Sequence, residues 1–187
     1  MEERHILVVQ VEDHPGVLNR VVSLMRRRSF NIDSITVGHS EIPGVSRMTI
    51  VVRGASDQVE QVGKQLYKLM EVLKVSDITD QQCVAHEMAL IKVAAKPHQR
   101  AEILQIAQIY DAKVVDASPN TLLLEAVAGE QKIEALLAML KGFGIRELVR
   151  SGVIAMARGG GGTSAAQRNG SGRIDRALET APVAVAG

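Results

Sequence analysis

The chain has 187 residues, of which 46% are hydrophobic and only 2% are aromatic, with no Trp. Aliphatic side chains must therefore build the core, and functions that stack aromatic rings on nucleic-acid bases are disfavoured. Lys and Arg number 22 against 21 Asp and Glu, so no excess of positive charge indicates a nucleic acid or an anionic membrane as partner.

The single cysteine, Cys83, has no partner for an intramolecular disulfide, which is typical of a reducing compartment. The first apolar run, residues 6–9, is shorter than the core of a signal peptide, and no run approaches membrane-spanning length. We therefore expect a cytoplasmic protein with no membrane segment.

Hydrophobic periodicity in the first half of the chain predicts the order β-α-β-β-α-β. Apolar, β-branched runs predict strands, and apolar residues three and four apart predict the stripe of a helix that faces a core. The predicted strands cover residues 5–11, 32–37, 48–52 and 73–78, and the predicted helices cover 17–28 and 56–70.

The second half repeats this order. Its predicted strands cover residues 88–95, 113–116, 122–127 and 145–149, and its helices carry the stripes Ile103, Leu104, Ala107, Ile109 and Ile133, Leu136, Leu137, Leu140. Two split β-α-β units in tandem predict an α+β protein of two ferredoxin-like domains, residues 4–79 and 83–158, each with its helices on one face of the sheet.

Two further features concern surfaces outside these cores. The runs 6–9 and 48–52 are apolar on both faces of their strands, and helices on one side cover only one face, so we expect a second copy of the chain to cover the other. Residues 159–187 are rich in Gly and poor in apolar side chains, which predicts a flexible tail with at most a weak helical pattern at 174–178.

The pattern of reactive residues predicts neither a catalytic site nor a metal site. The five histidines (His5, His14, His39, His86 and His98) lack metal-ligand spacing, and we expect them to face solvent or lie in turns. RNA-recognition domains share the predicted topology, but they read bases with aromatic residues on the central strands, and residues 5–11 and 47–52 carry none. We interpret Arg26–Arg28 as a solvated helix end.

One motif indicates a ligand. Asp13-His14-Pro15-Gly16-Val17-Leu18 lies between the first predicted strand and helix, with Asp13 as a candidate N-cap and Pro15 suited to the first helical turn. The free N–H groups of Gly16, Val17 and Leu18 would point outward at the positive end of the helix dipole, where they can bind a carboxylate. An ordinary capped helix start remains an equally good interpretation from spacing alone.

The same motif resembles the start of an ACT domain, a small regulatory module that binds amino acids. The chain also resembles the small, regulatory subunit of acetohydroxyacid synthase (acetolactate synthase) over residues 5–159. The resemblance is carried by residues 30–38 (Phe-Asn-Ile-Asp-Ser-Ile-Thr-Val-Gly), 46–50, 64–69, 72–75, 87–93 and 150–159 (Arg-Ser-Gly-Val-Ile-Ala-Met-Ala-Arg-Gly).

The resemblance implies a homodimer that binds valine, or leucine or isoleucine, between paired ACT domains. The backbone of Gly16, Val17 and Leu18 would then receive the carboxylate of the effector, and Asn31 would reach it from the partner subunit. Asp13, where other members often have Asn, would pair with the ammonium group. Ile32 and Ile35 would suit a branched side chain.

The implied function is that of a non-catalytic subunit of a transferase complex in branched-chain amino acid biosynthesis. A large catalytic subunit would hold thiamine diphosphate, Mg²⁺ and FAD and condense pyruvate with pyruvate or 2-ketobutyrate, whereas this chain would bind no cofactor. It would raise that activity and confer feedback inhibition by valine. The alternative is a stand-alone ACT-domain sensor that acts on a transcription or uptake system; a self-sufficient enzyme is disfavoured because no acid–base pair or metal set appears.

Overall fold

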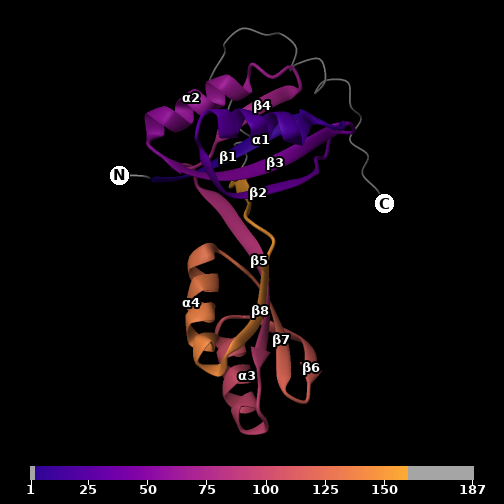
Figure 1. The fold of residues 1–187 in the computed structure, drawn as a ribbon, viewed down its shortest axis with the longest axis vertical. Helices are drawn as coiled ribbons and strands as arrows, with labels where there is room; N and C mark the ends of the chain where they lie inside the picture. The colour runs from indigo at the N-terminus through magenta and orange to yellow at the C-terminus, as the bar shows by residue number, and fades with distance from the viewer. Residues whose placement is uncertain (1–2, 160–187) are drawn as a thin grey trace. The chain divides into compact units, whose positions relative to one another are not determined.

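The computed structural model describes residues 3–159 and divides the chain into two compact units. The described residues of unit 1 are 3–84 and 155–159, and unit 2 comprises Ala85–Ile154 (Figure 1). The chain therefore crosses from unit 1 into unit 2 and later returns. Residues 155–158, which the sequence analysis grouped with the second domain, belong to unit 1, and the predicted tail lies outside the described residues except for Gly159.

Unit 1 is a four-stranded antiparallel sheet with two helices. The elements are β1 (Glu3–Glu12), α1 (Val17–Arg27), β2 (Asn31–His39), β3 (Val45–Gly54), α2 (Ser56–Leu66) and β4 (Val72–Asp77). The strand order β2-β3-β1-β4 places β2 and β4 at the edges, and α1 and α2 lie over the same face (Figure 1).

Unit 2 repeats this plan. Its elements are β5 (Cys83–Ala94, which begins in unit 1), the 3₁₀ turn Pro97–Gln99, α3 (Arg100–Ile109), β6 (Lys113–Ser118), β7 (Thr121–Ala128), α4 (Glu130–Leu140), a second 3₁₀ turn Lys141–Phe143 and β8 (Ile145–Arg150). The strand β9 (Ile154–Ala157) starts at the last residue of unit 2 and continues in unit 1. The strand order is β6-β7-β5-β8, and β9 pairs with β5. The predicted fold class, two tandem ferredoxin-like domains, is confirmed.

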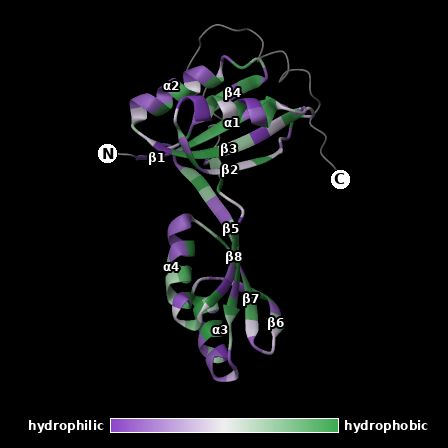
Figure 2. Cartoon of the chain, in the orientation of Figure 1, coloured by the Kyte–Doolittle hydropathy of each residue, from purple (hydrophilic) through white to green (hydrophobic). Residues whose placement is uncertain are grey.

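Each unit has its own aliphatic core between sheet and helices. In unit 1, alternate residues of β1 and β3 point toward the helices, because successive strand side chains face opposite sides of a sheet. They meet the apolar stripes of α1 and α2. Figure 2 shows that both helices also carry hydrophilic residues. The buried residues are Leu7, Val9, Val11, Met48, Ile50 and Val52 on the strands and Val17, Val21, Leu24, Met25, Val59, Val62 and Leu66 on the helices.

The face of the unit 1 sheet that points away from the helices is also buried in part. Val8 and Val51 are 3% and 1% exposed there. The carbonyl oxygen of Ala155 in β9 accepts a hydrogen bond from Nη2 of Arg47 at 2.9 Å. Successive side chains of a strand lie on opposite faces of the sheet. Met48 faces the core, so the side chain of its neighbour Arg47 lies on the second face. The unpredicted strand β9 therefore contributes a contact on a face that the sequence analysis assigned to a second copy.

Among the described residues, no helix is long and apolar enough to cross a membrane.

Candidate functional site

The loop between β1 and α1 has a backbone conformation that favours glycine. Gly16 is the N-cap of α1 and has φ of 93°, in the left-handed region that L side chains rarely adopt. A Cβ at this position would meet nothing within 4 Å, so there is room for a side chain. Other residues are disfavoured because of the backbone conformation. The loop is held at its start by the N–H of Asp13, which donates to the carbonyl of Gly44 at 2.9 Å.

The start of α1 leaves backbone donors free. Helical bonding begins with the N–H of Arg20, which donates to the carbonyl of Gly16 at 3.0 Å. No side chain caps the helix and its first turn has no acidic residue. Within the described part of the chain, the N–H groups of Gly16 and Leu18 have no recorded acceptor, and that of Val17 has only a long contact of 3.5 Å with the His14 carbonyl. The helix start can therefore bind a carboxylate.

Asp13 does not cap α1, so its predicted role as the N-cap is wrong. The helix begins at Val17, the predicted first residue, but its N-cap is Gly16, and Pro15 precedes the first turn. The carboxylate of Asp13 instead accepts a hydrogen bond from Oγ of Ser46 at 3.1 Å. Its other oxygen lies 3.1 Å from Nδ1 of His39. An anionic group thus lies in the same loop as the free N–H groups.

His39 is a residue of this site that the sequence analysis missed. It is the last residue of β2 and pairs in register with Ser46 of β3, and this pairing brings both side chains to Asp13. Nothing in the spacing of Asp13 and His39 along the chain indicates the contact. Only the register of β2 on β3 places them together.

Asn31 lies at the opposite end of the sheet from the loop. It starts β2 and pairs with Arg53, which in turn pairs with Arg4 near the start of β1, whereas the loop follows the end of β1 at Glu12. Eight strand residues at about 3.3 Å each separate these ends by roughly 26 Å. The structure therefore does not bring Asn31 to Gly16 within one chain.

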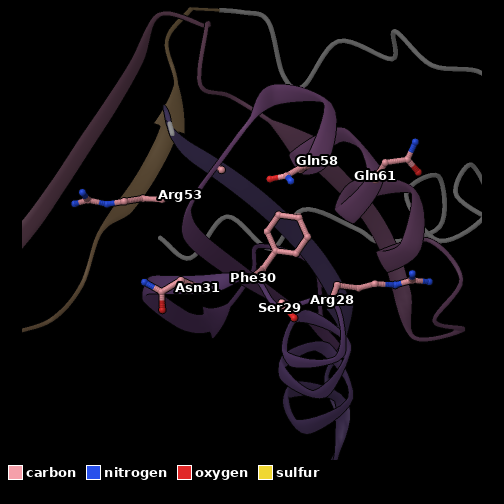
Figure 3. A pocket seen from close by; sticks show the side chains of 8 residues that line it. Arg28, Ser29, Phe30, Asn31, Arg53, Gln58 and Gln61 are labelled. Carbon is pink, nitrogen blue, oxygen red and sulfur yellow. The ribbon is translucent and has the colours of Figure 1, made fainter. Parts of the chain in front are cut away.

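Asn31 is one of the residues that line a pocket of unit 1 (Figure 3). It is lined by Arg28, Ser29, Phe30, Asn31, Arg53, Gly54, Gln58 and Gln61. The side chains of Arg28 and Arg53 point away from each other, with Phe30 between them (Figure 3). Nε of Arg53 donates to Asp33 at 2.6 Å. The two guanidinium groups thus do not converge on a common anion.

Two other groups of predicted site residues have different surroundings. Ile32 and Ile35, predicted to suit the side chain of an effector, are partly buried and pack against the unit 1 core from β2.

The prediction that all histidines face solvent or lie in turns is wrong for His5, which is 4% exposed and lies 3.6 Å from Asp77. Among residues 3–159, no group of three or more His, Cys, Asp or Glu could hold a metal ion.

Comparison with family models identifies the class of unit 1. Residues 7–74, which include the loop and Asn31, match the model described as an acetohydroxyacid synthase small subunit-like ACT domain. Unit 1 is thus an ACT domain. Residues 86–159 match the model described as the small subunit of acetolactate synthase.

Individual relatives extend the similarity over most of the chain. The acetolactate synthase small subunit of Bacillus subtilis is 48% identical over 158 residues, which are 83% of this chain and 91% of that protein. That of Mycolicibacterium smegmatis is 47% identical over 163 residues, 87% of this chain and 96% of that protein. The chain belongs to the family of acetolactate synthase small subunits.

A solved structure agrees with this assignment. The crystal structure of the acetolactate synthase small subunit from Thermotoga maritima matches with a TM-score of 0.78 and 40% sequence identity, and the match covers 83% of this chain and 98% of that one.

Proposed function

We propose that this chain is the regulatory subunit of acetolactate synthase in branched-chain amino acid biosynthesis. In this role it activates a cytoplasmic, thiamine-diphosphate-dependent catalytic subunit and makes it sensitive to valine. Thiamine diphosphate, Mg²⁺ and FAD belong to the catalytic partner. Membership of the small-subunit family supports the assignment, and the match of residues 86–159 to a small-subunit model disfavours a stand-alone ACT-domain sensor.

The observation that carries the proposal is that the β1–α1 loop holds both free N–H donors and a carboxylate. A free amino acid has a carboxylate and an ammonium group on one carbon. The unpaired N–H groups of Gly16 and Leu18 offer donors to the carboxylate, and the helix dipole favours a negative charge there. The carboxylate of Asp13 offers an acceptor to the ammonium group. Leu18 is 44% exposed and is available to an aliphatic side chain.

A second copy of the chain would complete this site. β2 is an edge strand of the unit 1 sheet, so its outer backbone groups can pair with another strand. Antiparallel pairing of two β2 strands about a twofold axis would bring the start of β2 in one copy near the end of β2 in the other. Asn31 starts β2, and His39, which contacts Asp13, ends it, so we expect Asn31 to lie near the loop of the partner copy. This homodimer would hold two equivalent valine sites, each made of both copies.

Valine can regulate only by differential binding. An effector shifts an equilibrium between two arrangements of a complex by the difference in its affinity for them, typically about 1–3 kcal/mol of coupling. By the same linkage, the catalytic subunit changes the affinity for valine by the same factor.

Isothermal titration of the purified chain with L-valine tests the site. Asn31→Ala removes a hydrogen bond to the ligand, and we expect about two- to tenfold weaker binding. Gly16→Ala puts a side chain on a residue with φ of 93°, so the loop conformation seen in the structure costs about 1–2 kcal/mol more, and we expect binding weaker by about tenfold.

Two matched variants are the controls for this titration. Asn120→Ala changes an exposed Asn in unit 2, and Gly142→Ala changes a glycine with ordinary φ and nothing within 4 Å of a Cβ, so both should bind valine as the parent chain does. Unchanged affinity in both Asn31→Ala and Gly16→Ala would contradict the site.

A further inference from the structure

The carboxylate proposed to receive the ammonium group of the effector already contacts a histidine in the free chain. Nδ1 of His39 lies 3.1 Å from Oδ2 of Asp13. The side chain of His39 is 86% exposed and that of Asp13 is 40% exposed, so both are accessible to a ligand from solvent. Ser46, on the other carboxylate oxygen, is neutral and cannot change its charge near neutral pH.

The charged groups around His39 come from two elements and one loop. Asp13, from the loop, is its direct partner. Next to Asp13, Nε2 of His14 lies 3.3 Å from Glu12 and forms a separate exposed pair. On β3, the neighbouring Arg47 donates to the carbonyl of Ala155. Of the two histidines named here, His39 contacts Asp13, whereas His14 pairs with Glu12. His14 can therefore be the control for His39.

We infer that His39 competes with the ammonium group of the effector for Asp13, so that affinity for a zwitterionic amino acid rises with pH. The inference rests on the proposed function, because it concerns the same site. Histidine ordinarily changes its charge between pH 5 and 8, whereas the amine of a free amino acid stays protonated in that range. His39 thus makes effector binding sensitive to the acidity of the surroundings.

The sign follows from the two protonation states. When the His39 ring is protonated, it pairs with Asp13 and repels the incoming ammonium group, so valine binds more weakly. When the ring is neutral, the attraction of Asp13 for the ammonium group is unopposed and binding is tighter. Exposed ion pairs are weak, and the expected change in Kd across this range is about two- to fivefold.

The test is titration of the full chain with L-valine at several pH values between 5.5 and 8, with thermal melts of every protein to establish that it is folded. The parent chain should bind more tightly as pH rises. His39→Gln, which cannot be protonated, should bind at every pH about as tightly as the parent chain does at pH 8. His14→Gln should keep the pH dependence of the parent chain.

Three outcomes would overturn the inference. These are valine binding that does not depend on pH in the parent chain, a pH dependence that persists in His39→Gln, or one that disappears in His14→Gln. In all three, valine still binds and the proposed function stands. No valine binding at any pH would overturn the proposed effector function together with the inference.

A second readout does not depend on affinity. Because coupling between two ligands is reciprocal, saturating valine should disfavour the protonated ring of His39. In NMR spectra of the histidine side chains, the midpoint of the His39 titration should move to lower pH when valine is present, and those of His86 and His98 in unit 2 should not move. A His39 midpoint that valine leaves unchanged would contradict the inference.

Discussion

At the scale of single residues, Glu87 of unit 2 is a carboxylate with almost no exposure to solvent. It is 4% exposed, and Arg150 contacts both of its oxygens, with Nε donating to Oε2 at 2.9 Å. The same guanidinium group reaches Glu134 on α4. The hydrogen bond with Glu87 raises the pKa of Arg150 above its ordinary value, against the opposing effect of burial. Arg150 therefore compensates a buried charge and links β5, β8 and α4.

Loss of Arg150 should be costly because it leaves a buried charge without a partner. We expect Arg150→Met to lower the free energy of unfolding by about 3 kcal/mol, measured by urea denaturation. Lys92→Met is the matched control, since Lys92 pairs with Glu147 on the same two strands but both side chains are largely exposed. Its cost should stay below about 1 kcal/mol. Equal losses in the two variants would show that the burial of Glu87 does not determine the effect.

Individual residues also show where sequence analysis reaches its limit. The importance of Gly16 follows from its place between a strand and a helix, and the structure adds the left-handed φ. The roles of Asp13, His39 and His5 do not follow, because each depends on which residue of another strand lies opposite. Strand register depends on the apolar patterns of both strands together and on the turn that joins them, so the pattern of one strand alone does not give the residue that lies opposite.

Regular elements, at the next scale, are the features that periodicity predicts best. Within residues 3–159, all four α-helices have apolar stripes in the sequence, and eight of the nine strands coincide with apolar or alternating runs. The missed strand, β9, is the four-residue segment Ile-Ala-Met-Ala, in which Ala and Met have no strong preference for strands. It forms because β5 offers a pairing partner and Arg47 a hydrogen bond.

The stripe of α4 allows a test of the unit 2 core. Ile133 is fully buried, and its replacement by Ala leaves a cavity, so we expect Ile133→Ala to lower the free energy of unfolding by about 2–5 kcal/mol. Met139, on the same helix, is 50% exposed, and Met139→Ala should change stability by less than about 0.5 kcal/mol. Chemical denaturation followed by circular dichroism measures both. A small effect at Ile133 would contradict the packing of α4 on the sheet.

Regulation, at the scale of the whole molecule, requires the second subunit. We expect the purified chain alone to form no acetolactate from pyruvate. Added to a catalytic subunit from the same source, it should raise the rate and make it sensitive to valine. Asn31→Ala should keep the activation but require about two- to tenfold more valine for inhibition, because the substitution removes the proposed contact with the effector. Asn120→Ala should behave as the parent chain does. A colorimetric acetolactate assay measures each result, and turnover without the catalytic subunit would contradict a regulatory role.

The return of the chain from unit 2 to unit 1 has a mechanical consequence. A domain joined to its neighbour by a single linker can rotate about each single bond of that linker. A rotation of one domain then need not rotate the other. Unit 2 begins at Ala85 and ends at Ile154, and unit 1 resumes at Ala155, so two covalent strands join the units. The two crossings are separate lengths of chain, so a turn about one backbone bond of either crossing has to be accommodated in the other. Cutting the chain once between residues 151 and 153 would leave the units covalently joined through the crossing between residues 84 and 85 alone.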